Sequence, residues 1–76
     1  MDNVYEQKEI FCKHELLALV QVIDKKILRL EYKLVDDGLE IVTVVRLTEA
    51  GEVYKPINVT ADSLLALARD VLRYID

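Results

Sequence analysis

The stretch LEIVTVVRL, which runs from Leu39 to Leu47, decides the fold of this chain. Its Ile, Val and Thr residues favour a β-strand. A strand with one face in water alternates apolar and polar residues, because successive side chains point to opposite faces. Here apolar residues occupy both parities, with Leu39, Ile41, Val45 and Leu47 on one and Val42 and Val44 on the other. We therefore expect the middle strand of a sheet, covered on both faces.

The strand before this stretch alternates cleanly. In LRLEYKL, residues 28–34, Leu28, Leu30, Tyr32 and Leu34 share one face, and charged residues share the other. The following Asp36-Asp37-Gly38 favours a tight turn, so strands 27–35 and 39–48 form an antiparallel hairpin. A two-residue loop places Leu30 opposite Val45, and a three-residue loop places the same leucine positions opposite Val42 and Val44. Both registers remain open.

A second turn follows at residues 48–52, TEAGE, where Gly51 suits the left-handed position. It leads into strand 53–59. Proline cannot donate a ladder hydrogen bond, so Pro56 predicts that this strand lies at a sheet edge.

Two amphipathic helices flank the strands. Residues 12–25 carry an apolar stripe at helical spacing, formed by Cys12, Leu16, Leu19, Val20 and Ile23. Residues 61–75 carry a wide apolar face, formed by Leu64, Leu65, Leu67, Ala68, Val71, Leu72 and Ile75. Thr60 or Asp62 can cap this second helix. Within residues 1–11, we expect Val4 to Phe11 to form a short strand or an arm on a neighbouring molecule.

These elements predict one α+β domain: a three- or four-stranded antiparallel β-meander with one helix before it and one C-terminal helix after it. The 76 residues are 53% apolar, which is more than a small single-layer core can bury. Either one helix covers each face of the sheet, or the helices cover one face and a second copy covers the other. We expect a homodimer through the sheet face, with Ile41, Val42, Val44 and Val45 as its interface.

The composition bounds the class of protein. Cys12 is the single cysteine, so no disulfide forms within the chain. The sequence has no apolar run of transmembrane length, and MDNVYEQKEI lacks the pattern of a signal peptide. We therefore expect a cytoplasmic protein without membrane contact. The net charge of −4 disfavours a general electrostatic attraction to nucleic acid.

No residue pattern points to catalysis, to a metal or to a cofactor. His14 is the single histidine, and Cys12 and Glu15 beside it do not complete a metal site. Gly38 and Gly51 are the only glycines, and since each serves a turn, no phosphate-binding loop remains. We expect no enzymatic activity.

A group of basic and tyrosine residues is the strongest candidate for a ligand site. It comprises Arg29, Lys33, Arg46, Lys55, Tyr32 and Tyr54. In the two-residue-loop register Arg29 faces Arg46, and like charges face each other favourably only across an anion or a carboxylate. Such a place suits a phosphate of single-stranded nucleic acid, with a tyrosine stacked on a base. It suits Glu31 or an acidic residue of a partner equally well, and we favour this pairing within the chain or between subunits.

The segment from Lys55 to Leu65, KPINVTADSLL, runs from the last strand through a polar cap into the C-terminal helix. This plan resembles the positive-cofactor-four type of single-stranded DNA-binding domain, a dimeric antiparallel sheet followed by a helix. The likeness covers less than half of the chain, which lacks that family's basic character. The helix expected at residues 13–23 has no counterpart there, so the likeness is an analogy of fold.

The sequence thus predicts a small non-catalytic protein-interaction or regulatory module, homodimeric, with an unidentified protein as a further partner. Two alternatives remain. One is a single-stranded nucleic-acid-binding module that uses the basic and tyrosine group. The other is an acidic inhibitor that mimics nucleic acid through Asp36, Asp37 and Glu40.

Overall fold

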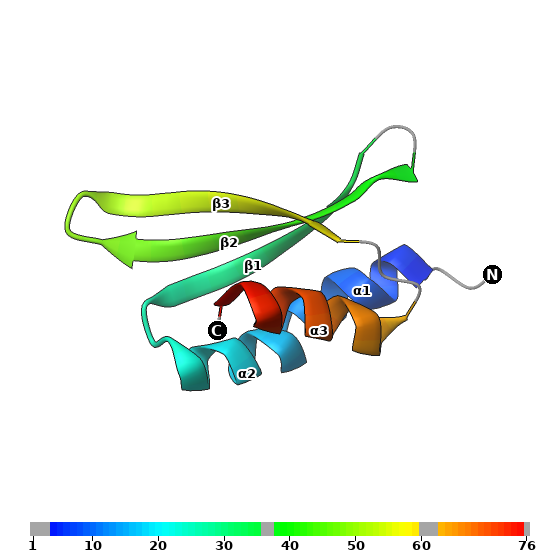
Figure 1. Ribbon diagram of the computed structural model, residues 1–76, viewed down its shortest axis with the longest axis horizontal. Coiled ribbons are helices and arrows are strands. Elements are labelled where there is room, and N and C mark those ends of the chain that lie inside the picture. The colour runs from blue at the N-terminus through cyan, green and yellow to red at the C-terminus, as the bar shows by residue number, and fades with distance from the viewer. Residues whose placement is uncertain (1–3, 36–37, 60–62, 76) are drawn as a thin grey trace.

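The computed structural model describes residues 4–35, 38–59 and 63–75, and it confirms the α+β fold (Figure 1). A helical segment, α1 (Val4–Lys13) and α2 (Glu15–Ile23), leads into three strands. These are β1 (Ile27–Leu34), β2 (Glu40–Thr48) and β3 (Gly51–Val59), and the C-terminal helix is α3 (Leu64–Ile75). The strands form an antiparallel sheet in the order β1-β2-β3, so β2 is the middle strand and the strand with Pro56 lies at an edge, as predicted.

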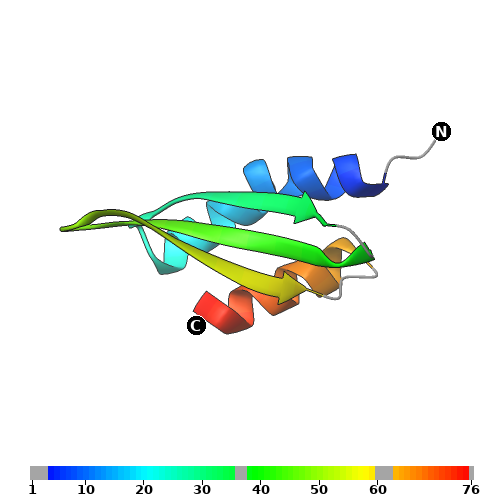
Figure 2. The same cartoon turned by 90° about the horizontal axis from the view of Figure 1, so that it is seen from above.

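All three helices lie on one face of the sheet, as Figures 1 and 2 show from two directions. The alternative with one helix on each face is therefore wrong. The core fills the space between the helices and that face of the sheet. It comprises Cys12, Leu16, Val20, Ile27, Leu30, Val42, Val44, Val59, Leu67, Ala68 and Val71. The opposite face, here called the open face, carries no helix of the described residues.

The hairpin has the register of the three-residue loop. Leu30 pairs with Val44 and Tyr32 with Val42, and the N–H of Val35 donates to the carbonyl of Leu39 at 2.8 Å. Even-numbered residues of β2 therefore face the helices, and odd-numbered ones face outward. Asp36 and Asp37 lie outside the described residues.

A bulge at Leu28 corrects the predicted alternation of β1. Ile27 pairs with Arg46 and Arg29 with Val45, so Leu28 is one extra residue on this strand. Ile27 consequently takes the position in the core that the alternation assigned to Leu28, which is 37% exposed.

The N-terminal segment is the main error of the sequence prediction. Val4–Lys13 is a helix, not a strand or an arm. The predicted helix 12–25 corresponds to the end of α1 and to α2, which ends at Ile23. The two parts meet at His14, whose φ of −120° and ψ of −79° depart from helical geometry. The hydrogen bonds continue through the bend, since His14 N–H donates to Ile10 and Ala18 N–H donates to His14.

The last helix begins with a cap at Ser63. Its hydroxyl oxygen accepts a hydrogen bond from the N–H of Ala66 at 3.2 Å, which is the geometry of an N-cap. The predicted caps, Thr60 and Asp62, lie outside the described residues. The second turn holds Gly51 at a φ of 109°, in agreement with its predicted left-handed conformation.

Candidate protein-binding surface

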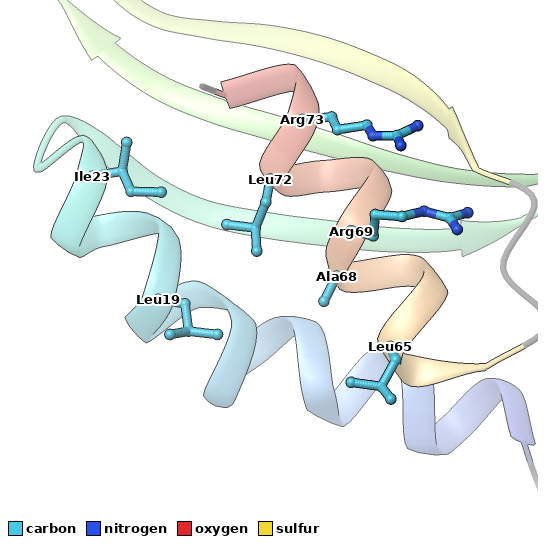
Figure 3. Close-up of a pocket in the computed structure, with 7 residues that line it drawn as sticks. All are labelled: Leu19, Ile23, Leu65, Ala68, Arg69, Leu72 and Arg73. Atoms are coloured by element: carbon cyan, nitrogen blue, oxygen red, sulfur yellow. The ribbon is translucent and has the colours of Figure 1, made fainter.

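An apolar groove of about 720 Å³ lies between α2 and α3 on the outer side of the helices. It is lined by Leu19, Ile23, Leu65, Ala68, Arg69, Leu72 and Arg73. In Figure 3 the side chain of Leu72 points from α3 toward α2, whereas Arg69 and Arg73 extend from the far side of α3. The groove therefore has an apolar floor and one basic rim.

Large apolar side chains of α2 and α3 are exposed to water in this groove and, at Val22, one helical turn beyond Leu19. The side chains of Leu65 on α3 and Val22 on α2 are 82% and 80% exposed, and those of Leu19 and Ile23 are about half exposed. Leu72, in the groove itself, is partly buried. We call these five residues the helix-layer patch. Single exposed apolar residues are ordinary, but a contiguous patch of them marks an interaction surface.

The sequence did not predict this patch, although one signal was present. The predicted apolar face of the last helix was wide, and Leu65 lies at its margin. Similarly, Leu19 and Ile23 lie to one side of the stripe through Leu16 and Val20, both of which are buried. A helix that packs on one sheet buries a narrower stripe than these sequences offer.

The predicted interface residues are divided between the two faces of the sheet. Val42 and Val44 are buried in the core beneath the helices, so they contribute to no interface on the open face. Ile41 and Val45 face the open side. Val45 is itself fully buried, since Arg29 and Tyr54 are its cross-strand neighbours and their side chains meet.

A polar network covers this part of the open face. Arg29 donates to Glu31 at 2.8 Å, to Glu52 at 3.2 Å and to the hydroxyl of Tyr54 at 2.9 Å. The Arg29 guanidinium also lies 5.7 Å from the centre of the Tyr54 ring. Hydrogen bonds to Glu31 and Glu52 raise the pKa of Arg29, and hydrogen bonds from Tyr54 and Arg29 lower the pKa of Glu52. Val45 of the middle strand is thus covered on the outer face by side chains of the neighbouring strands, whereas Leu47 on the same face is 49% exposed.

The structure also divides the basic and tyrosine group. Arg29, Lys33 and Tyr54 lie on the open face, and Tyr32, Arg46 and Lys55 lie on the face that bears the helices. Arg29 does not oppose Arg46, because the observed register pairs it with Val45, so the anion site predicted between the two arginines is wrong. Arg46 instead forms a 2.8 Å ion pair with Asp24.

A buried polar cluster beneath α1 was not predicted. The ammonium group of Lys8, whose side chain is 4% exposed, lies 2.7 Å from Oε1 of Glu40, and the hydroxyl of Tyr32 donates to the same oxygen at 2.7 Å. Burial tends to raise the pKa of Glu40. The hydrogen bonds from Lys8 and Tyr32 and the charge of Lys8 outweigh it, so this pKa lies below its ordinary value. The cluster joins α1 to the sheet.

The remaining reactive side chains form no site in the described part of the chain. Cys12 is buried, and burial raises the pKa of its thiol to about 11, which keeps it protonated and unreactive. Within residues 4–35, 38–59 and 63–75, there is no group of three His, Cys, Asp or Glu side chains that could hold a metal ion. Among the described residues, the three helices all lack the length and hydrophobicity of a membrane-spanning segment.

Comparisons with known proteins give no family to which the chain can be assigned. No family model, no curated protein and no solved structure matches it. The likeness of the segment Lys55 to Leu65 to single-stranded DNA-binding domains therefore remains an analogy of fold.

Proposed function

We propose that this chain is a non-catalytic protein-interaction module that works as a homodimer, with the helix-layer patch as its dimer interface. The single observation that carries the proposal is this exposed apolar patch, defined by Leu19, Val22, Ile23, Leu65 and Leu72. Exposure of a large apolar side chain to water costs about 1.5–3 kcal/mol relative to burial. Burial of the helix-layer patch against a partner is therefore favourable.

The chain exposes more surface than a compact monomer of its mass. The accessible surface is 5351 Å². A monomer of 8.8 kDa exposes about 4,800 Å² by the usual scaling with mass. The chain thus exposes roughly 550 Å² more than the average for its mass, in keeping with its elongated dimensions of 42 × 24 × 20 Å.

The charges beside the patch are self-complementary. Along α2, Glu15 lies one helical turn before Leu19 and Ile23 one turn after it. Along α3, Arg73 lies on the basic rim of the groove, about two turns after Leu65. The two helices run in the same direction (Figure 1). A two-fold axis perpendicular to them therefore brings Glu15 of one copy toward Arg73 of the other, with the leucines between.

Sedimentation equilibrium over a concentration series tests the proposal. We expect a dimer for the unaltered chain and a monomer for Leu65→Lys and for Leu19→Lys, each with an unchanged circular dichroism spectrum. Leu47→Lys is the matched control, since Leu47 is 49% exposed and lies on the open face. If only Leu47→Lys loses the dimer, the interface lies on the sheet face. If the unaltered chain is a monomer at about 1 mM, the homodimer is refuted.

A charge exchange gives a second, more specific test. Glu15→Arg and Arg73→Glu are each expected to weaken the dimer through repulsion of like charges, and the double variant is expected to restore it. Lys13→Glu, on α1 and outside the groove, is the control for a change of charge away from the interface. If the double variant does not regain the dimer, the proposed pairing of Glu15 with Arg73 is refuted. The apolar interface is tested separately, by Leu65→Lys and Leu19→Lys.

A further inference from the structure

A second hollow, independent of the helix-layer patch, lies beneath the β2–β3 hairpin beside the end of α3. Its volume is about 200 Å³, and it is lined by Val44, Arg46, Thr48, Val53, Lys55 and Tyr74. Pockets for drug-sized molecules occupy about 300–1,000 Å³, so this hollow accommodates one small chemical group. Its polar groups include a guanidinium, an ammonium and a phenol.

One hydrogen-bond donor of Arg46 has no acceptor among the described residues. One terminal nitrogen of the guanidinium bonds to Asp24 at 2.8 Å. The Nε atom, by contrast, is buried and has no hydrogen-bond partner within the described residues. Buried donors in folded proteins are nearly always paired, and an unpaired one indicates a missing acceptor.

Lys55 places a second positive charge beside this donor. Arg46 pairs with Val53 across the strands, and Lys55 follows two residues later on the same face, which is a diagonal neighbour position. Lys55 forms no ion pair among the residues that the structure describes. Two neighbouring cations on one sheet face repel each other unless an anion lies between them.

We propose that this hollow is a binding site for a phosphate-class oxyanion, held by Arg46 Nε, by the ammonium of Lys55 and by the hydroxyl of Tyr74. Asp24 orients the guanidinium from the other side. With Asp24 counted, the charge around the hollow is about +1. The end of α3 contributes roughly −0.5, so the net field still favours an anion, although weakly.

Titration with inorganic phosphate at constant ionic strength, followed through backbone amide shifts in NMR spectra, tests the site. We expect saturable shifts at residues 44–48 and 53–55 with an affinity on the order of 1 mM. Arg46→Gln and Lys55→Gln are each expected to weaken binding about tenfold, since each removes a charge-assisted hydrogen bond. Arg29→Gln is the matched control, because its side chain is as exposed as that of Arg46, at 41%, and lies on the opposite face.

Asp24→Asn distinguishes a ligand site from a purely structural role of Arg46. Removal of the competing carboxylate is expected to strengthen phosphate binding several-fold. Titration with acetate separates the chemical classes, since we expect a planar carboxylate to bind more weakly than phosphate. The proposal is overturned if the amide shifts do not saturate with phosphate. It is also overturned if Lys55→Gln or Asp24→Asn binds phosphate with the affinity of the unaltered chain.

Discussion

Replacement of Lys8 by Met is the sharpest test of how the N-terminal helix is held. The methionine keeps the length of the side chain but leaves the carboxylate of Glu40 without its cation. Breaking a fully buried ion pair costs about 3–5 kcal/mol. Glu40 is 14% exposed and keeps the hydrogen bond from Tyr32, so we expect a loss of about 2–3 kcal/mol in the free energy of unfolding.

That loss is large for this chain. At about 0.05–0.15 kcal/mol per residue, a domain of 76 residues is stable by roughly 4–11 kcal/mol. Urea denaturation followed by circular dichroism measures the change. Lys13→Met, at an exposed position of the same helix, is expected to stay within about 0.5 kcal/mol of the unaltered chain.

A double variant isolates the pair itself. Glu40→Gln combined with Lys8→Met removes both charges and preserves an acceptor for Tyr32, so its cost should be smaller than the sum of the single costs by about 1.5 kcal/mol or more. Additive costs, or a single Lys8→Met cost below about 0.5 kcal/mol, would show that the contact contributes little.

The pH dependence follows from the lowered pKa of Glu40. A carboxyl whose pKa is lower in the folded state contributes stability above the unfolded value of 4.5, and loses it as the pH falls through the folded value. In Lys8→Met the lowering by Lys8 is gone. The difference in stability between the two proteins is therefore expected to shrink below pH 4.5, and a constant difference contradicts the assignment.

Three further predictions concern the core, the thiol and the second turn. Leu67→Ala, at a buried position of α3, should cost about 2–5 kcal/mol in urea denaturation, whereas Leu65→Ala should leave monomer stability within about 0.5 kcal/mol. Cys12 should react with a disulfide reagent at pH 8 only at the rate of unfolding, and immediate reaction of the native chain contradicts its burial. Gly51→Ala should cost about 1–2 kcal/mol by thermal denaturation, because its φ of 109° strains any residue with a Cβ while no atom lies within 4 Å of that position; an unchanged melting temperature excludes this strain.

Much of the fold could be predicted from the sequence because its local signals agree. The alternation in residues 28–34, the strand former LEIVTVVRL and Pro56 at an edge gave the order of the sheet. The register could not be decided, since Asp36-Asp37-Gly38 suits a two-residue and a three-residue loop equally well. That choice determines which residues of β2 face the helices, so the predicted interface mixed residues of both faces.

The N-terminal helix was missed because a lysine stands in its apolar stripe. Lys8, Cys12, Leu16 and Val20 follow one another at intervals of four, and all four are buried. A lysine is rarely buried unless it is paired, and its partner, Glu40, is 32 residues away. The helix-layer patch was missed for the opposite reason, since apolar residues such as Leu65 were expected to be in the core. In both cases tertiary packing, and not the local sequence pattern, determines whether the side chain is buried or exposed.

The two outer strands of the sheet limit how far it can grow. The bulge at Leu28 twists one border, and Pro56 removes a donor from the other. Both features discourage a strand of a second molecule from joining, which is how exposed borders otherwise seed fibrils. The two borders of the sheet therefore favour assembly through side-chain surfaces over the addition of strands.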